Sequence, residues 1–361
     1  MFKVGLVGKR SLAYVPGLRS VDGLHVTDLC EVDLTAEASA REQGIEGFTS
    51  DFEALLGRVD AVVLGTPMHL HAVQSIQALQ AGRAVLSEVT AAVTVDECQQ
   101  LKATSGTYMF AENYCYFEQN LTALELAKQG RFGDIYYGEG DYVHEVRFLH
   151  RSRDGKPTWR MEWQVGARGN TYCTHELGPL MRMFRAADPG VRVATVACFG
   201  TGTHTDPTLN HDDNTLTLVK LSNGALLKLR LDMVSNRPHS VRYELQGVLG
   251  AYESDHSHRF WFGENRPVHW DDAIQREWKD IGEFRNALPG TLREEIEASK
   301  AHGHGGGDYM VGRRFAQALV GGVEPEIGLH DAVEWTMVGL LSQESILQGG
   351  APVPMPAWVY A

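Results

Sequence analysis

VDAVVLGTPMHLHAVQSIQALQAGRAVLSEV, residues 59–89, reads as a strand, a helix and a second strand with few residues between them. Asp60–Gly65 is a short, continuous apolar run, which is typical of a strand buried on both faces of a parallel sheet. A helix follows and ends at Gly82, because apolar residues recur before it at helical spacing, namely Leu70, Val73, Ile76 and Leu79. Ala84–Ser87 then predicts a second buried strand, so the stretch indicates an α/β domain.

The carboxyl ends of these two strands predict a ligand site. Parallel strands joined by a helix form a right-handed crossover, and ligands of such sheets bind beyond the carboxyl ends of the strands. Several side chains follow the two strands, and we expect them to line one rim and to contact a cofactor. They are Thr66, Pro67, His69, His71 and Glu88.

Composition limits the classes of function. A length of 361 residues with 43% hydrophobic content allows a sizeable core and two or three domains. The net charge of -13, without any block of Lys and Arg, argues against a nucleic-acid partner. Five cysteines without a C-x-x-C pair predict free thiols in a reducing compartment. No apolar run approaches about 18 residues and Met1 leads almost directly into an apolar strand, so we expect a cytoplasmic protein with no membrane partner.

The predicted first strand, Lys3–Gly8, leads into an altered phosphate-binding turn. The G-x-G-x-x-G pattern of dinucleotide-binding domains needs its second glycine so that the backbone can approach the pyrophosphate. Here the sequence is Gly8-Lys9-Arg10-Ser11, in which only the first glycine is in place. We expect a shortened turn in which Arg10 or Ser11 contacts phosphate, and the alternative is an ordinary turn that binds nothing.

An acidic residue follows the predicted second strand, Leu24–Cys30. Glu31 stands about 20 residues after the turn, where an acid accepts hydrogen bonds from the adenosine ribose. A carboxylate there would repel a 2'-phosphate, so the position favours NAD over NADP. The alternative is a solvated acid that opens a turn.

The fifth predicted strand, Tyr108–Phe110, ends the first domain. Asn113 follows it and has two possible roles, as a contact of the nicotinamide or its ribose, or as the cap of the helix predicted over Glu118–Gln129. We therefore predict a Rossmann domain with a doubly wound parallel sheet over residues 1–116.

From Asp134 the periodicity becomes strand-like. The runs are IYYGEGDYVHE, VRVATVACFG, TLTLVKLSNGALLKLRLDM and SVRYELQGVLGAYE, and Ser222-Asn223-Gly224 predicts a hairpin turn within the third. Helical periodicity returns over Asp308–Gln348. We assign residues 117–361 to a second domain, an open, mostly antiparallel sheet with helices; the family resemblance described below implies that it binds substrate and forms oligomer contacts. In an alternative, the final helices pack back on the first domain. The exposed sheet face favours a homodimer or homotetramer.

Residues 59–89 also resemble a known family. The motif G-T-P-x-H-x-H-A, the helix ending in A-G and the acid after the next strand are similar to the nucleotide-binding domain of Gfo/Idh/MocA oxidoreductases. Dehydrogenases of that family generally carry E-K-P after this strand and D-x-x-x-H in the substrate domain, and their Lys and His handle the proton of the oxidised hydroxyl. Here Val89 replaces the lysine and Thr171 the aspartate, so only His175 remains. Valine transfers no proton, and this apparatus is therefore incomplete.

Longer motifs resemble a narrower branch, glycoside hydrolase family 109. They are Glu88-Val89-x-Ala-Ala, Glu112-Asn-x-Cys-Tyr116, Gly138-Glu-Gly-Asp-Tyr142-Val-His144, Trp159-Arg160, Gly169-Asn-x-Tyr172-x-x-His175-x-Leu-Gly-Pro179, Arg237-Pro-x-Ser240 and His304-Gly-Gly-x-Asp308. The resemblance implies an NAD-dependent glycosidase, a class known chiefly for removing α-linked N-acetylgalactosamine. The chain departs from the pattern at Thr90, where proline is usual, at Glu176, where glycine is common, and in the phosphate turn.

The resemblance also implies a mechanism without net oxidation. NAD takes a hydride from C3 of the sugar, a base removes the C2 proton, the C1 substituent leaves, water adds, and the hydride returns. Ordinary glycosidases need two carboxylates at a fixed separation, whereas this route needs a base that titrates near neutrality, and histidine qualifies. His175 is the implied acid/base, and Tyr172 and Tyr142 are implied to position or polarise the sugar.

Further sugar contacts are implied by the same motifs. They are Glu112 with a hydroxyl, His144, Trp159 and Arg160 as pocket walls, and His304 and Asp308 near the substrate. A simpler role for Tyr142 and His144 is packing against the neighbouring strand. The glycine run before Asp308 predicts a loop or lid, followed by a helix that Asp308 caps.

The histidine pairs His69-x-His71, His256-x-His258 and His302-x-His304 suggest a metal, but no cysteine or carboxylate at metal-binding spacing completes any of them. We predict no metal site.

Three functions stay open. The first is an NAD-dependent glycosidase, and the second is a net sugar or polyol oxidoreductase that uses NAD or NADP with the same pocket. The third is a sugar or nucleotide sensor without catalysis, which the altered turn and the missing lysine favour. In each case the expected partner is a small-molecule glycoside or sugar.

Overall fold

The computed structural model describes residues 1–264, 269–274 and 276–361, and contacts divide the chain into two units. The first unit comprises Met1–Tyr116, Glu295–Met337 and Pro356–Ala361, and the second comprises Phe117–Glu294 and Val338–Met355. The predicted second domain was residues 117–361, with the alternative that the final helices pack back on the first domain, and residues 295–337 group with the first unit. Helical periodicity predicts an apolar face without identifying its partner, so the sequence left this assignment open.

The first unit contains a parallel sheet in the order β3-β2-β1-β4-β5-β6 among the described residues. Its strands are β1 (Phe2–Val7), β2 (Leu24–Cys30), β3 (Gly47–Thr49), β4 (Ala61–Leu64), β5 (Ala84–Ser87) and β6 (Tyr108–Phe110). The strand order reverses between β1 and β4, which is where doubly wound sheets bind dinucleotides. The predicted Rossmann sheet is confirmed. The sequence missed β3, a three-residue edge strand without a buried residue, so Tyr108–Phe110 is the sixth strand.

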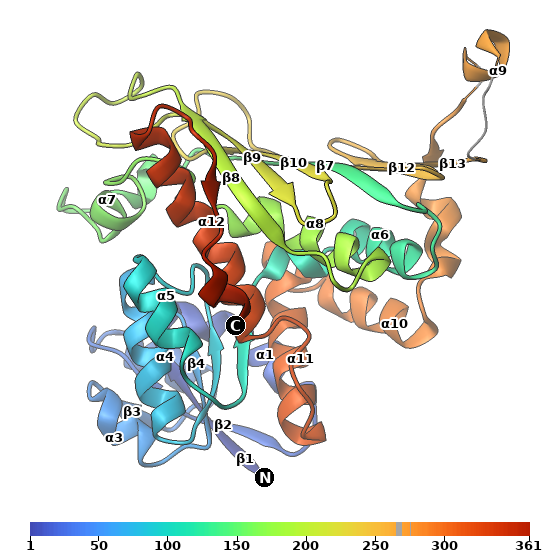
Figure 1. Ribbon diagram of the computed structural model, residues 1–361. Helices are drawn as coiled ribbons and strands as arrows, with labels where there is room; N and C mark the ends of the chain where they lie inside the picture. Colours follow the sequence, from blue (N-terminus) through green and yellow to red (C-terminus); the bar gives the residue numbers. More distant parts are fainter. Residues whose placement is uncertain (265–268, 275) are drawn as a thin grey trace. The chain divides into compact units, whose positions relative to one another are not determined.

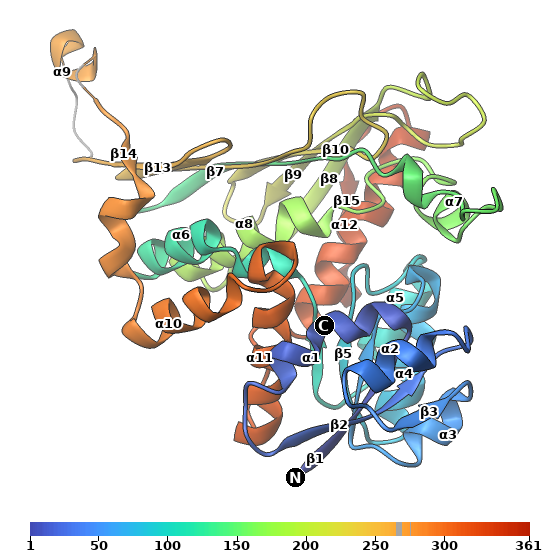
Figure 2. The same cartoon turned by 180° about the vertical axis from the view of Figure 1, so that it is seen from behind.

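Helices surround this sheet in the first unit. They are η1 (Lys9–Tyr14), α1 (Val15–Leu18), α2 (Ala36–Glu42), α3 (Phe52–Leu56), η2 (Met68–Leu70), α4 (His71–Gln80), α5 (Val95–Lys102), η3 (Asn113–Tyr116), η6 (His304–Gly306), α11 (Gly307–Gly321) and η7 (Ala357–Tyr360). Figures 1 and 2 both show α1 beside α11, although these helices are about 290 residues apart in the chain.

Two glycines allow α1 and α11 to approach closely. A Cβ atom on Gly17 would lie 2.0 Å from the carbonyl oxygen of Tyr309, and one on Gly312 would lie 2.5 Å from that of Tyr14. The backbones therefore touch where a side chain would otherwise separate them. This contact holds α11 against α1.

The second unit contains a sheet in the order β14-β13-β12-β11-β7-β10-β9-β8-β15, in which only the β10–β7 pairing is parallel in the described part of the chain. Its elements are α6 (Glu118–Lys128), β7 (Ile135–Val143), η4 (Arg147–Leu149), α7 (Arg160–Trp163), α8 (Thr174–Ala187), β8 (Val193–Gly200), β9 (Thr215–Leu221), β10 (Leu226–Asp232), β11 (Ser240–Gly247), β12 (Gly250–Ser254), β13 (His258–Phe262), α9 (Trp270–Ile274), β14 (Lys279–Asp280), η5 (Ile281–Ala287) and β15 (Val353–Pro354). Two further helices, α10 (Gly290–Ser299) and α12 (Leu329–Leu347), have residues in both units. The predicted open, mostly antiparallel sheet is confirmed, although the sequence missed β13, β14 and β15.

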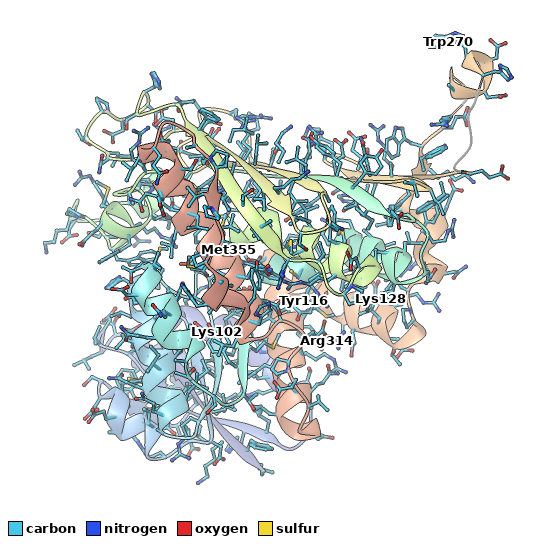
Figure 3. All side chains as sticks on the ribbon, in the orientation of Figure 1. Lys102, Tyr116, Lys128, Trp270, Arg314 and Met355 are labelled. Carbon is cyan, nitrogen blue, oxygen red and sulfur yellow. The ribbon has the colours of Figure 1, made fainter. Side chains whose placement is uncertain are left out.

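One face of this sheet is covered by α6 and α8, as both views show (Figures 1 and 2). Large apolar side chains stand exposed elsewhere on the unit, including Phe199, Leu216 and Trp270, the last of which Figure 3 labels. The homodimer or homotetramer stays a prediction. Among the described residues, no helix combines the length and the apolar character needed to span a membrane.

Candidate functional site

The turn after β1 is tight even though two glycines of the usual pattern are missing. Gly8 has a φ of 82°, and a Cβ atom on it would lie 2.6 Å from the carbonyl oxygen of Gly65. Ser11 is fully buried, and its hydroxyl donates a hydrogen bond of 2.5 Å to the Gly8 carbonyl. The Ser11 hydroxyl therefore closes the turn from within, and its predicted contact with phosphate stays a prediction.

Glu31 lies at the carboxyl end of β2, directly beside this turn. Its Oε2 atom accepts a hydrogen bond of 2.8 Å from the Lys9 amide, and its Oε1 atom accepts from the amides of Val32 and Asp33. A carboxylate has about four acceptor sites, so Glu31 retains capacity for a ribose hydroxyl. The position, its charge and its remaining acceptor capacity fit NAD.

His71 connects the loops that follow β4 and β5. Its side chain is 1% exposed, with Nδ1 2.7 Å from the Thr90 carbonyl oxygen and Nε2 2.8 Å from that of Thr66. Burial lowers the pKa of His71, whereas the two carbonyl contacts act in the opposite direction. Because both ring nitrogens are engaged within the protein, His71 orients the rim. Pro67 is the N-cap of η2, and His69 lies within η2. Both residues are half-buried.

An ion cluster, comprising Arg10, Glu88, Asn113, His304 and Asp308, lies at the carboxyl ends of the strands of the first unit. Arg10 Nε is 3.0 Å from Glu88 Oε1, and its two terminal nitrogens lie 2.9 and 3.0 Å from the two carboxylate oxygens of Asp308. Asn113 Nδ2 donates to Asp308 Oδ1 at 2.9 Å, and His304 Nδ1 lies 2.7 Å from Asp308 Oδ2. The Arg10 guanidinium is thus held by two carboxylates.

The cluster corrects two expectations about helix caps. The N-cap of α11 is Gly306, and Asp308 lies inside the helix with its carboxylate turned to the cluster. The N-cap of α6 is Phe117, so Asn113 does not cap that helix. A tertiary partner engages both side chains, and for Asn113 the cap was one of two predicted roles, of which the contact with the nicotinamide or its ribose stays a prediction.

Opposite charges in the ion cluster shift two pKa values. Burial alone would raise the pKa of Asp308, but hydrogen bonds from His304 and Arg10 lower it to about 2. The same hydrogen bond with Asp308 raises the pKa of His304 above its usual value. Tyr14, which sequence analysis missed, adds a hydrogen bond of 2.5 Å from its hydroxyl to Glu88 Oε1.

Glu112 follows β6 in the first unit and is fully buried. Its Oε1 atom accepts a hydrogen bond of 3.3 Å from the amide of Tyr114. Its predicted contact with a sugar hydroxyl stays a prediction.

An aromatic cluster of Tyr142, His144, Tyr172 and His175 lies in the second unit. The ring centroid of Tyr142 is 5.0 Å from that of His175, 6.0 Å from that of Tyr172 and 5.4 Å from that of His144. The rings of Tyr172 and His175 meet edge to face at 4.8 Å. The structure thus brings together the three residues proposed for catalysis.

His239 joins this cluster and was missed by sequence analysis. Its ring centroid lies 4.3 Å from that of His144, and burial together with the neighbouring His239 lowers the pKa of His144. His239 occupies the variable position of the motif Arg237-Pro-x-Ser240. That motif was the sequence signal from which His239 could have been identified as a site residue.

The approach of β7 to α8 positions His175 near Tyr142. A Cβ atom on Gly140 would lie 2.6 Å from the carbonyl oxygen of Glu176, so only glycine fits between strand and helix. Pro179, four residues after His175, has no N–H to donate to the His175 carbonyl, as the helix would otherwise require. The Tyr243 hydroxyl on β11 donates to that carbonyl instead, at 2.6 Å.

Tyr243→Phe is therefore expected to lower the free energy of unfolding by about 1–2 kcal/mol, because a buried carbonyl loses its donor. Urea titration measures this difference. Tyr136→Phe is the matched control, since Tyr136 is 52% exposed on the same sheet, and we expect a change below about 0.5 kcal/mol. Equal effects of the two substitutions would contradict the assigned role of Tyr243.

Trp159 and Arg160 start α7 and are half-buried. The Arg160 guanidinium lies 4.4 Å from the ring centroid of Trp159, and its Nη1 donates to Gln164 at 2.8 Å. Within the described ranges, neither side chain forms a hydrogen bond or ring contact with the aromatic cluster. Their role as pocket walls stays a prediction.

Comparisons with known proteins identify the family of both parts of the chain. Residues 116–360 match the model described as "Glycosyl hydrolase 109, C-terminal domain", and residues 2–107 match "Oxidoreductase family, NAD-binding Rossmann fold". A glycosyl hydrolase family 109 protein of Saccharopolyspora erythraea is 31% identical, over 98% of this chain and 82% of that protein. One of Solibacter usitatus is 27% identical, over 98% and 87%.

Solved structures share the fold at lower identity. Levoglucosan dehydrogenase in complex with NADH has a TM-score of 0.76 at 20% identity, over 98% of this chain and 99% of that chain. The WlbA dehydrogenase from Bordetella pertussis in complex with NADH and UDP-GlcNAcA has a TM-score of 0.75 at 20% identity, over 98% of each chain. The chain therefore belongs to glycosyl hydrolase family 109 and begins with the NAD-binding Rossmann fold of the Gfo/Idh/MocA oxidoreductases.

Proposed function

We propose that the protein is an NAD-dependent glycosidase that removes α-linked N-acetylgalactosamine or a similar sugar through oxidation at C3, elimination and addition of water. Family membership supports this proposal. The observation that carries it is the aromatic cluster, in which one imidazole, His175, lies between two tyrosine rings. Val89 stands where dehydrogenases of the wider family carry a lysine, which leaves His175 as the proton-transfer group.

The side chains of the cluster have complementary tasks in this reaction. When bound, NAD supplies the acceptor for the C3 hydride and returns that hydride at the end. Tyr142 and Tyr172 hydrogen-bond the C3 oxygen, whose hydroxyl proton passes to solvent water when the hydride leaves and comes back from water when the hydride returns. Once C3 is a ketone, the C2 proton is acidic, and His175 accepts it while the C1–O bond breaks and the leaving oxygen takes a proton from water. Hydroxide from that water adds at C1, and His175, whose imidazolium proton has exchanged with solvent in the meantime, protonates C2.

Other residues are proposed to hold the sugar and the cofactor. Glu112, His144, Trp159 and Arg160 contact sugar hydroxyls or the aglycone in this proposal. The rim of the first unit, with Glu31 on the adenosine ribose, binds NAD in preference to NADP.

The test compares release of the aglycone with accumulation of NADH. Protein, NAD and p-nitrophenyl α-N-acetylgalactosaminide are mixed in heavy water, and nitrophenol, NADH and deuterium at C2 of the product are measured. We expect nitrophenol release without accumulating NADH, and deuterium at C2. Stoichiometric NADH would instead indicate a sugar or polyol oxidoreductase. Binding of glycosides without either product, unchanged by His175→Ala, would indicate a sensor.

A further inference from the structure

Asp308 and His304 have no task in the proposed reaction, yet they complete the ion cluster of the first unit. Asp308 is 2% exposed and accepts from three side chains, those of Arg10, Asn113 and His304. These partners come from separate segments, and 298 residues separate Arg10 from Asp308 in the chain. Such a carboxylate costs free energy to bury, and its three partners offset that cost.

The partners of Asp308 lie at the part of the sheet that binds dinucleotides. Arg10 lies in the turn after β1, Asn113 follows β6, and Glu88, which also binds Arg10, follows β5. All three positions are at carboxyl ends of parallel strands, where dinucleotides bind. Because α11 contacts α1 backbone to backbone at Gly17, Asp308 is presented to Arg10 from a rigid helix.

The charge balance of the ion cluster depends on His304. Arg10 contributes one positive charge, and Glu88 and Asp308 contribute two negative charges, so the cluster is neutral only when His304 is protonated. His304 faces Asp308, which lies on α11. The groups around this pair are Arg10 and Tyr14 on η1, Glu88 after β5 and the uncharged Asn113 on η3. The NAD pyrophosphate is negative, and net negative charge on the rim repels it.

We propose that Asp308 and His304 are positioning residues of the NAD site. Asp308 holds Arg10 and Asn113 in place on the rim, and protonated His304 offsets the second carboxylate. Sequence motifs had suggested sugar contacts for both residues, and this assignment replaces that role. It concerns NAD binding and holds whether the catalysed reaction is hydrolysis or oxidation.

The test measures the dissociation constant of NADH by fluorescence titration of the full chain from about pH 6 to about pH 9. His304 loses its charge as the pH rises through its raised pKa, so we expect wild-type affinity to weaken about fivefold over this range. His304→Gln keeps a polar side chain without the charge, and its affinity is expected to be weak and independent of pH. Asp308→Asn is expected to weaken binding about tenfold, because Arg10 and Asn113 lose their acceptor, and to move the pH dependence to lower pH, because His304 loses the partner that raises its pKa.

His302→Gln is the matched control. His302 lies two residues from His304 in the same turn but stacks on Tyr309 with ring centroids 4.7 Å apart, outside the ion cluster. We expect it to keep the wild-type pH profile. Circular dichroism checks that Asp308→Asn folds. His304→Gln is a second variant, and it replaces a side chain that is 62% exposed, so we expect it to fold normally.

Two results would overturn the assignment. One is a wild-type dissociation constant that does not change with pH, and the other is the same pH profile in His304→Gln as in His302→Gln. Failure of the glycosidase proposal is seen separately, as absence of aglycone release by a protein that binds NADH.

Discussion

His175→Ala is expected to lower kcat for glycoside cleavage by about 10²–10⁴-fold, the usual contribution of a general acid or base. Its imidazole is 7% exposed, between the rings of Tyr142 and Tyr172. Alanine removes the imidazole that contacts both tyrosine rings, whereas the remaining His144, whose pKa is lowered by burial, packs against Tyr142 and His239. Elimination at C2 therefore loses its base.

Two measurements separate this effect from a loss of structure. The affinity for NADH is expected to be unchanged in His175→Ala, and added imidazole is expected to restore part of the rate. His256→Ala serves as a control, because the His256 side chain is 91% exposed in the same unit. If His175→Ala kept more than about a tenth of the wild-type kcat, His175 would not be the proton-transfer group.

Acid is expected to destabilise the protein through a second histidine, His150. Its side chain is 3% exposed, and its Nε2 atom has no hydrogen-bond partner among the described residues. Burial, followed by repulsion from His211, lowers the pKa of His150 from 6.5 to about 4. The folded state thus binds fewer protons than the unfolded state between these two values. The contribution of His150 is complete above pH 6.5 and is lost as the pH falls toward about 4.

The expected loss of unfolding free energy from His150 over this interval is at most about 3 kcal/mol. Urea titrations at several pH values measure it in wild type and in His150→Leu, which keeps an apolar side chain of similar size. The variant is expected to lose less stability on acidification, by about 2–3 kcal/mol. Parallel curves for the two proteins would contradict the assigned burial of a neutral imidazole. Buried His211 remains in both proteins, so the difference between the curves reports the titration of His150 together with its repulsion of His211.

The local pattern of apolar residues was sufficient to predict most strands of the first sheet. The strands predicted at Leu24–Cys30, Ala84–Ser87 and Tyr108–Phe110 have those bounds in the structure, because apolar residues predominate in each run and a glycine lies one or two residues before each start. The short edge strand Gly47–Thr49 carries no such run and was missed. Edge strands bury few residues, so their sequences contain little apolar signal.

The sequence predicted the helices and strands better than it predicted which side chains bond to each other. Asp308 and Asn113 both have residue types that cap helices. Local spacing assigned Asp308 to a cap and gave Asn113 either a cap or a contact with the nicotinamide or its ribose, yet the two side chains bond to each other. Tyr243 replaces a helical donor that Pro179 lacks, and no local pattern connects those two residues. A hydrogen bond between distant segments depends on how the chain folds back, which periodicity does not encode.

The sequence by itself determined the Rossmann sheet, the open second sheet and the family, because apolar period and motif spacing are properties of neighbouring residues. The tertiary structure decided that residues 295–337 join the nucleotide-binding unit, that His239 joins the aromatic cluster, and that Asp308 holds Arg10. These depend on close backbone contacts such as that between Gly17 and Tyr309. Contacts of this kind arise from packing in three dimensions, and they bring together residues whose separation in the chain gives no sign of their proximity.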